Sequence, residues 1–144
     1  MNKSPDCVVD ASVGIKLFLD ESLSDAAHAL FSRLADEAQV RFFVPDLFYI
    51  ECTNILWKYH LRYGLSADDA IAAIAHLEQL RLQSVPTIHL MMDALAIALQ
   101  HEITAYDAAY VALAQRLALP LVTADQALVR KLAETPFAVQ QLGG

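Results

Sequence analysis

Apolar residues recur along the chain in two patterns, one typical of strands and the other of helices. Short apolar runs predict β-strands over residues 7–9, 41–44, 83–85, 121–123 and 137–141. Apolar residues spaced three or four apart predict helices over residues 13–19, 24–38, 46–63, 66–80, 88–101, 103–118 and 125–133. Strands that alternate with helices and are apolar on both faces predict a three-layer α/β/α domain. Its central sheet is expected to be mostly parallel, with roughly four to five strands.

Polar residues mark where several of these helices begin and end. Asp46 is placed to cap the helix over residues 46–63, and Gly64 suits the left-handed position that follows a helix. Ser66 and Asp69 have the spacing of a capping box at the start of the next helix. Parallel sheets of this kind bind ligands beyond the carboxyl ends of their strands, so candidate chemistry is sought at that edge.

Length and composition predict a single cytoplasmic domain over residues 1–144. The size of 144 residues suits one domain, and 56% hydrophobic content, against about 45 to 50% in typical proteins, excludes intrinsic disorder. The longest stretch without acidic or basic residues, 82–92, is too short to span a membrane. Asp6 precedes the first apolar run, which argues against a signal peptide. The surplus of apolar residues favours a protein partner or a homodimer.

The net charge and the positions of the histidines and cysteines further restrict the possible ligands and metal sites. A net charge of −7 gives no general attraction for nucleic acid or for an anionic membrane. Bound divalent cations reverse the local field, and two Mg²⁺ ions would bring the total to about −3. The five histidines form no recognisable metal motif. Cys7 and Cys52 lie in apolar segments and are expected to be buried thiols.

Three aspartates each have an ordinary structural interpretation. Asp10 and Asp125 follow directly after predicted strands and precede helices, where an aspartate commonly caps the helix. Asp107 lies three residues after Thr104, at the spacing of a capping box. Taken singly, none of the three is distinctive.

Glu51 does not fit such an interpretation. It shares a helical stripe with Phe48, Cys52, Ile55 and Tyr59, the face expected to pack inward. A buried carboxylate needs compensation, and no lysine or arginine occupies the positions three or four residues away. A metal ion or a distant basic group is therefore expected beside it.

The four acids are predicted to converge at one edge of the sheet. Asp10 and Asp125 lie at carboxyl ends of strands, Asp107 begins a helix that points to the same edge, and Glu51 lies just inside a helix that follows a strand. Clustered carboxylates repel one another unless cations neutralise them, and oxygen ligands favour one or two Mg²⁺ or Mn²⁺ ions. Such a site suits phosphodiester hydrolysis.

Four segments of the chain resemble PIN-domain nucleases, and most closely the VapC toxins of toxin–antitoxin pairs. They are Val8-Val9-Asp10-Ala11-Ser12-Val13, Tyr49-Ile50-Glu51-Cys52-Thr53-Asn54, Tyr106-Asp107-Ala108-Ala109-Tyr110-Val111-Ala112-Leu113-Ala114 and Leu121-Val122-Thr123-Ala124-Asp125. The resemblance covers essentially the whole chain, in order and with matching spacing.

The resemblance implies a function and partners. It gives Asp10, Glu51, Asp107 and Asp125 the catalytic and metal-binding positions of the family, with Ser12 and Thr123 as hydroxyls around them. It also implies Mg²⁺- or Mn²⁺-dependent endoribonuclease activity on single-stranded or looped RNA, homodimerisation, and inhibition by a small VapB-type antitoxin.

Two other functions are compatible with this fold class. A non-catalytic module would keep the fold and bind protein or RNA, but all four acids are present. A Mg²⁺-dependent phosphoacceptor domain requires a lysine at the end of a late strand, where this chain has Thr123-Ala124-Asp125. Lys16, Arg41, Lys58 and Arg62 are expected to be solvated rather than to contact the RNA backbone. The aromatic residues Trp57, Tyr59 and Tyr63 have rings suited to stacking on bases, but their helical spacing favours core or dimer contacts.

Overall fold

The computed structural model describes residues 6–144, so the part of the signal-peptide prediction that concerns residues 1–5 lies outside the described residues. All five strands of its sheet pair in parallel, in the order β3-β2-β1-β4-β5. The strands are β1 (Cys7–Val9), β2 (Phe42–Pro45), β3 (Leu82–Val85), β4 (Leu121–Thr123) and β5 (Val139–Gln141). The central strand β1 aligns Val8 with Phe43 of β2 and Leu121 of β4. Both the predicted sheet and its parallel pairing are confirmed.

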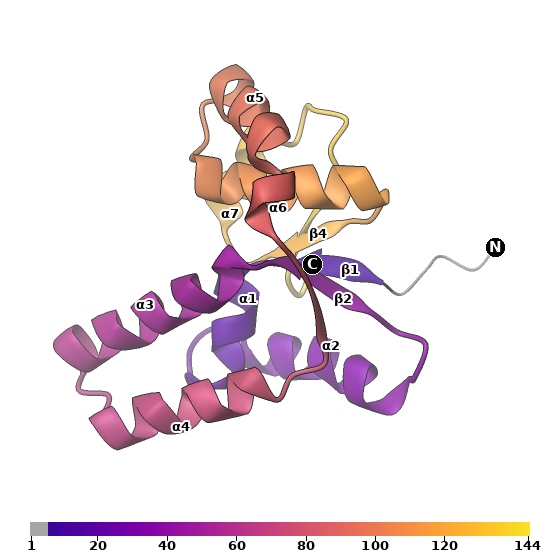
Figure 1. The fold of residues 1–144 in the computed structure, drawn as a ribbon. Helices are drawn as coiled ribbons and strands as arrows, with labels where there is room; N and C mark the ends of the chain where they lie inside the picture. Colours follow the sequence, from indigo (N-terminus) through magenta and orange to yellow (C-terminus); the bar gives the residue numbers. More distant parts are fainter. Residues whose placement is uncertain (1–5) are drawn as a thin grey trace.

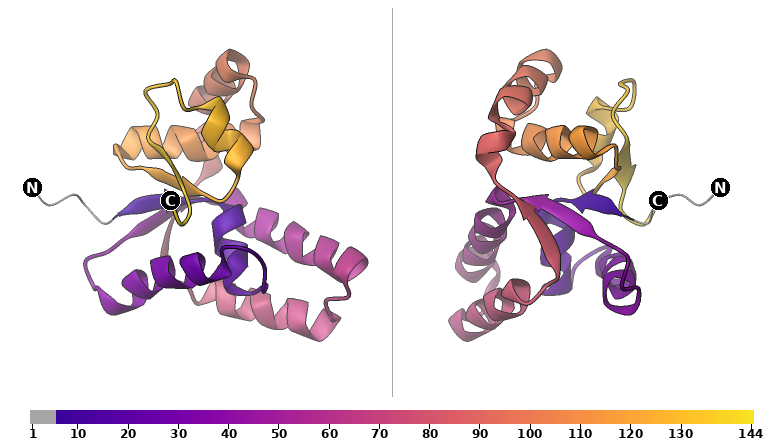
Figure 2. Two further views of the ribbon diagram at one scale, coloured as in Figure 1. Left: turned by 180° about the vertical axis from the view of Figure 1, so that it is seen from behind. Right: turned by 45° about the vertical axis from the view of Figure 1, so that its right-hand side comes forward.

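Helices cover both faces of the sheet, which confirms the three-layer arrangement (Figure 1). One face carries α6 and α7, with α5 packed against α6, and the other carries α1 to α4. Helices α3 and α4 lie side by side and extend beyond the sheet (Figure 2). The helices are α1 (Ala11–Gly14), α2 (Ser24–Asp36), α3 (Leu47–Tyr63), α4 (Ala67–Glu78), α5 (Met91–His101), α6 (Ala105–Leu117) and α7 (Gln126–Lys131), with 3₁₀ turns η1 (Ile15–Leu17) and η2 (Thr87–His89).

Two predicted helices are interrupted. The helix expected over residues 13–19 is a single α-helical turn, α1, followed by η1, and the one expected over residues 88–101 divides into η2 and α5. Leu90 separates η2 from α5 because its backbone, with φ −112° and ψ −7°, departs from α-helical geometry while its side chain is buried. A repeat of apolar residues shows which face of a segment is buried, but it does not distinguish an α-helix from a 3₁₀ turn.

The structure confirms two of the three helix-end residues expected from the sequence, Gly64 and Ser66, but not Asp46. Gly64 adopts the left-handed conformation, with φ +74°, and the Asp69 amide donates to the Ser66 hydroxyl at 3.0 Å. Asp46 does not cap α3 with its side chain, because its own backbone is already helical. Its carboxylate accepts a hydrogen bond from the Thr87 amide at 3.0 Å instead, which ties the start of α3 to η2.

Glycine at position 14 brings α1 against α3. A Cβ atom at Gly14 would lie 2.6 Å from the Phe48 ring, which is closer than carbon atoms can approach. The two helices therefore pack at a distance that only glycine permits. This contact holds the β1–α1 junction, which carries Asp10, close to the first turns of α3, which carry Glu51.

Helix α6 lies at the centre of the molecule. Its residues 108–114 are all buried, so the helix has no solvent face along that stretch. Cys7 and Cys52 are buried free thiols, as expected. No helix within residues 6–144 combines the length and the apolar character needed to cross a bilayer.

Candidate active site

Asp10 lies directly after β1 and caps α1. Its carboxylate oxygen Oδ1 accepts hydrogen bonds from the Val13 amide at 3.3 Å and from the Ser12 hydroxyl at 2.5 Å. The side chain is buried, with 6% of the residue exposed. The capping role expected for a lone aspartate is therefore present, and it holds the carboxylate at the carboxyl edge of the central strand.

Ser12 and Thr123 connect the ends of the two neighbouring strands. The Ser12 hydroxyl oxygen accepts a hydrogen bond from the Ala124 amide at 3.0 Å and lies 3.4 Å from the Thr123 hydroxyl. The Thr123 hydroxyl in turn accepts from the Asp125 amide at 3.1 Å. The two hydroxyls singled out from the sequence thus fix the backbone that carries Asp10 and Asp125.

Asp107 and Asp125 each begin a helix at the same edge. Asp125 caps α7, because its Oδ1 atom accepts from the amides of Ala127 at 3.0 Å and Leu128 at 3.2 Å. Asp107 lies in the first turn of α6, and its amide donates to the Thr104 hydroxyl at 3.1 Å. Thr104 therefore caps α6, and a hydrogen bond from Thr104 to the Asp107 carboxylate opposes the rise in the pKa of Asp107. Asp107 is partly buried, whereas Asp125 is exposed.

Glu51 projects from α3 toward α6, where a tyrosine compensates its burial. The Tyr110 hydroxyl donates to Glu51 Oε1 at 2.6 Å, and only 2% of Tyr110 is exposed. Sequence reasoning missed this contact. A signal was available: Tyr110 follows Asp107 by three residues on the same helix, so both side chains lie on one face of α6.

The charges of the four acids act on one another, with Asp107 at the centre. Burial, followed by the charge of Asp107, raises the pKa of Asp10 to about 6, against opposing hydrogen bonds from Ser12 and Thr123. Burial and the charge of Asp107 also raise the pKa of Glu51. Burial and the charge of Asp125 raise the pKa of Asp107. Asp107 therefore interacts with each of the other three carboxylates, which form one electrostatic cluster.

The cluster offers the ligands that a hard divalent cation requires. Its donors are carboxylate and hydroxyl oxygens, and within the described residues none of the four acids forms an ion pair with lysine or arginine. Burial raises the pKa of the nearby Cys52 thiol, so the thiol stays protonated and is a poor ligand.

The carboxylates are not assembled into a closed cage. No three acidic, histidine or cysteine side chains of residues 6–144 lie close enough together to hold a metal ion as they stand. The acids fit Mg²⁺ or Mn²⁺ by chemistry and charge, and ion binding requires their side chains to turn toward a common point.

Two of the basic residues considered from the sequence are engaged elsewhere. Lys16 is buried, and its Nζ atom pairs with Glu21 at 2.8 Å. Arg41 pairs with Asp6 at 3.2 Å, next to the amino end of β2 and hence at the opposite edge of the sheet. Lys58 instead lines a groove beside Glu51.

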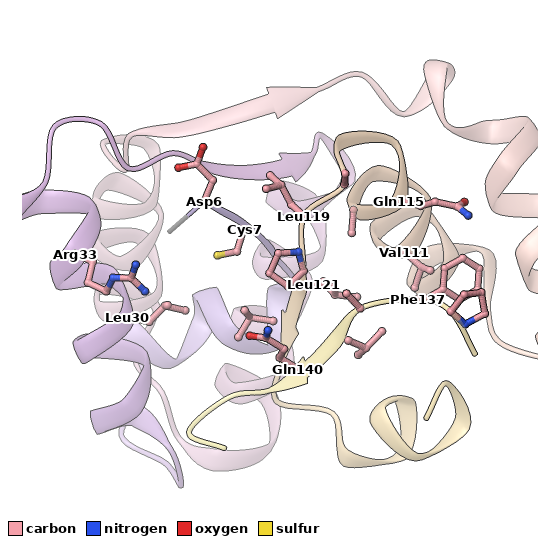
Figure 3. A pocket seen from close by; sticks show the side chains of 17 residues that line it. Asp6, Cys7, Leu30, Arg33, Val111, Gln115, Leu119, Leu121, Phe137 and Gln140 are labelled. Atoms are coloured by element: carbon pink, nitrogen blue, oxygen red, sulfur yellow. The ribbon is translucent and has the colours of Figure 1, made fainter. Parts of the chain in front are cut away.

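A larger hollow lies at the amino edge of the sheet and contains none of the four acids. Its volume is about 760 Å³, and its walls come from α2, α6 and the amino ends of β1, β4 and β5. Figure 3 shows Cys7, Leu121 and Phe137 around it, with Arg33 to one side. Its lining is largely apolar, and its position sets it apart from the acidic cluster.

Comparison with known proteins gives a consistent result. The PIN domain family matches residues 7–134. Ribonuclease VapC3 of Pyrobaculum aerophilum is 37% identical over 128 residues, which cover 86% of this chain and 92% of that protein. The crystal structure of PAE2754 from the same organism has a TM-score of 0.66 at 26% identity, with 96% of this chain and 91% of that chain covered. A toxin–antitoxin complex from Klebsiella pneumoniae has a TM-score of 0.60 at 17% identity, over 92% of this chain and 94% of that chain.

Proposed function

Because this chain belongs to the PIN-domain family and is a VapC-type ribonuclease, we propose that Asp10, Glu51, Asp107 and Asp125 hold one or two Mg²⁺ or Mn²⁺ ions for RNA hydrolysis. The observation that carries this assignment is the placement of the four carboxylates at one edge of the sheet: Asp10 and Asp125 follow β1 and β4, and Glu51 and Asp107 lie near the starts of α3 and α6. Such a concentration of negative charge is unfavourable without cations. The proposal therefore explains why the fold keeps four acids together at one edge.

The hydroxyls and carboxylates of the site have different roles in the proposed hydrolysis. The Ser12 and Tyr110 hydroxyls donate to Asp10 and Glu51 and so fix which oxygen atoms of these carboxylates remain available to an ion. If only some of the four carboxylates hold the ion, one of the others would accept the proton of the attacking water. A bound Mg²⁺ or Mn²⁺ ion supplies Lewis acidity, which lowers the pKa of a water and stabilises negative charge on the phosphate.

The direct test is cleavage of total RNA by the purified chain. We expect discrete fragments with Mg²⁺ or Mn²⁺ and none with EDTA, because the carboxylates alone supply no Lewis acid. Gel electrophoresis of the products separates selective cleavage from general degradation. Equal cleavage in EDTA would refute the metal assignment.

Substitution of Tyr110 by phenylalanine is expected to weaken metal binding while the fold is retained. The change removes the hydrogen bond to Glu51 and keeps the buried ring, so the loss reports on orientation of the carboxylate. Loss of such a partner typically lowers metal affinity by about 10- to 100-fold. Calorimetric titration with Mn²⁺ measures it directly, and an unchanged affinity would show that Glu51 needs no partner to bind the ion.

An antitoxin protein is the proposed regulatory partner. The fold matches a chain solved within a toxin–antitoxin complex, which supports a partner of this kind. We propose that a small VapB-type protein covers the acidic edge and blocks access of RNA. Inhibition of cleavage by the protein encoded beside this one tests the proposal.

We also propose that the chain forms a homodimer. Large apolar side chains are exposed around α5, at Ile88, Met91, Met92, Leu95 and Leu99. A run of exposed apolar residues of this kind is typical of a protein interface. Light scattering of the purified chain gives the mass that decides between monomer and dimer.

A further inference from the structure

A groove extends from the acidic cluster along α3. Its volume is about 710 Å³, and Glu51 lies at the end shared with the cluster. The other lining residues are Ile50, Thr53, Asn54, Trp57 and Lys58 of α3 and Tyr106 at the start of α6. Those of α3 follow the spacing of one helical face, so the groove has a continuous floor two turns long.

Two aromatic side chains of this groove are unusually exposed. Trp57 is 56% exposed and Tyr106 is 66% exposed. Large rings are normally buried, and their exposure beside a cleft marks a binding surface. Tyr106 directly precedes Asp107, so one ring lies at the cluster and the other lies farther along α3.

We propose that this groove binds the single-stranded part of the RNA next to the cleaved phosphate, with bases stacked on Tyr106 and Trp57 and a backbone phosphate at Lys58. The inference rests on the proposed nuclease function and assigns the path of its substrate. Stacking of bases on aromatic rings beside a cationic side chain is the common means of binding single strands.

The polarity of the lining favours RNA over an apolar helix of a protein partner. Thr53, Asn54 and Lys58 provide hydroxyl, amide and ammonium groups in the same lining. An amphipathic helix would require a stripe of aliphatic side chains, of which Ile50 is the sole member in this lining. Within the described residues Lys58 forms no ion pair, so its charge is available to a phosphate.

The dimensions suit a short segment of RNA. Glu51 and Trp57 are six positions apart on α3, which is about 9 Å along the helix axis. Stacked nucleotides are spaced at about 3.4 Å, so two to three bases fit between the carboxylate and the distal ring. The groove therefore has room for two to three nucleotides on one side of the cleaved bond.

Trp57 is the only tryptophan of the chain, so its fluorescence reports directly on the groove. An unstructured RNA oligonucleotide is titrated into the full chain in EDTA, where no hydrolysis occurs. We expect saturable quenching of Trp57, together with a rise in anisotropy of a labelled oligonucleotide. Absence of quenching at RNA concentrations that saturate the anisotropy signal would overturn the proposal.

Substitutions separate stacking from general binding. Tyr106→Ala and Trp57→Ala are each expected to weaken binding by roughly 5- to 100-fold, whereas Trp57→Phe keeps a ring and binds within a few-fold of the original chain. Lys58→Ala should reduce the slope of log K against log salt concentration by about 0.7. The matched control is Tyr63→Ala, which removes an exposed aromatic residue of α3 that does not line the groove.

The outcomes distinguish this inference from the function on which it rests. The proposed RNA groove would be overturned if all variants bound RNA equally, or if they lost only the binding of the antitoxin. Either result would leave the proposed nuclease function intact. Quenching that is retained in a chain unable to cleave RNA with any metal would support the groove and refute the proposed hydrolysis.

Discussion

Replacement of Asp107 by asparagine is expected to lower the rate of metal-dependent RNA cleavage by about a thousandfold or more. The charge of Asp107 raises the pKa of Asp10 and of Glu51, and Asp107 begins α6 at the same edge, so its loss removes a carboxylate from the middle of the cluster. Stabilisation of transition-state charge by a metal ion is worth several kcal/mol, and each 1.36 kcal/mol corresponds to a factor of about ten in rate. Initial rates on one defined RNA, with Mg²⁺ in excess, measure the change.

The Asp107→Asn variant separates chemistry from folding better than the other acids do. Thr104 caps α6, so asparagine at position 107 leaves the helix start intact, whereas Asp125 itself caps α7. Loss of a like charge from the cluster should also leave stability equal or slightly higher. Asp93→Asn, which alters an exposed carboxylate paired with Arg116 on α6, serves as control and should cleave normally. Cleavage by the Asp107 variant at the original rate would remove this residue from the mechanism.

The sheet and the positions of Asp10 and Asp125 were predictable because both depend on local sequence. A strand buried on both faces reads as an uninterrupted apolar run, and the residue that follows it commonly caps the next helix. Asp10 and Asp125 occupy such positions in the structure, as expected. Parallel pairing then brings both to one edge without any knowledge of tertiary contacts.

The contacts missed by sequence reasoning join residues far apart in the chain. Tyr110 and Glu51 are 59 positions apart, and their hydrogen bond depends on the packing distance between α3 and α6. Asp46 was expected to cap α3, but it bonds to Thr87, 41 positions away. The sequence showed that Glu51 needed compensation, yet the choice between a metal ion, a base and a tyrosine required the three-dimensional arrangement.

For charged and aromatic residues, too, the sequence did not show whether another part of the fold covers them. Lys16 and Lys58 have the same side chain, but Lys16 is buried against Glu21 and Lys58 lines the groove beside the cluster. Trp57 was expected to be a core or dimer contact; it is more than half exposed and so is not a core residue, while a dimer contact stays a prediction. Helical spacing identifies which residues share a face and leaves open whether another element covers that face.

The raised pKa of Asp10 makes the stability of the metal-free chain depend on pH. Burial raises this pKa from 3.8 to about 6, so the folded protein binds a proton that the unfolded chain has already released. Between these two values the folded state carries more protons, and its stability decreases as pH rises. Above pH 6 the folded protein retains an unfavourable buried charge, and the difference corresponds to about 3 kcal/mol.

The Asp10→Asn variant should therefore be more stable than the original chain at pH 7 in EDTA, by up to about 3 kcal/mol, and equal to it near pH 4. Asparagine keeps the side-chain oxygen that caps α1, so the comparison isolates the charge. Urea unfolding of both chains from pH 4 to 7 gives the difference in unfolding free energy, in which titration of carboxylates remote from the cluster cancels. Saturating Mg²⁺ at pH 7 should stabilise the original chain and not the variant, because only the former has the complete set of ligands. If the unfolding free energies of the two chains instead change with pH in the same way in EDTA, ionisation of Asp10 does not destabilise the folded state. The cluster would then need no cation to offset the charge of Asp10.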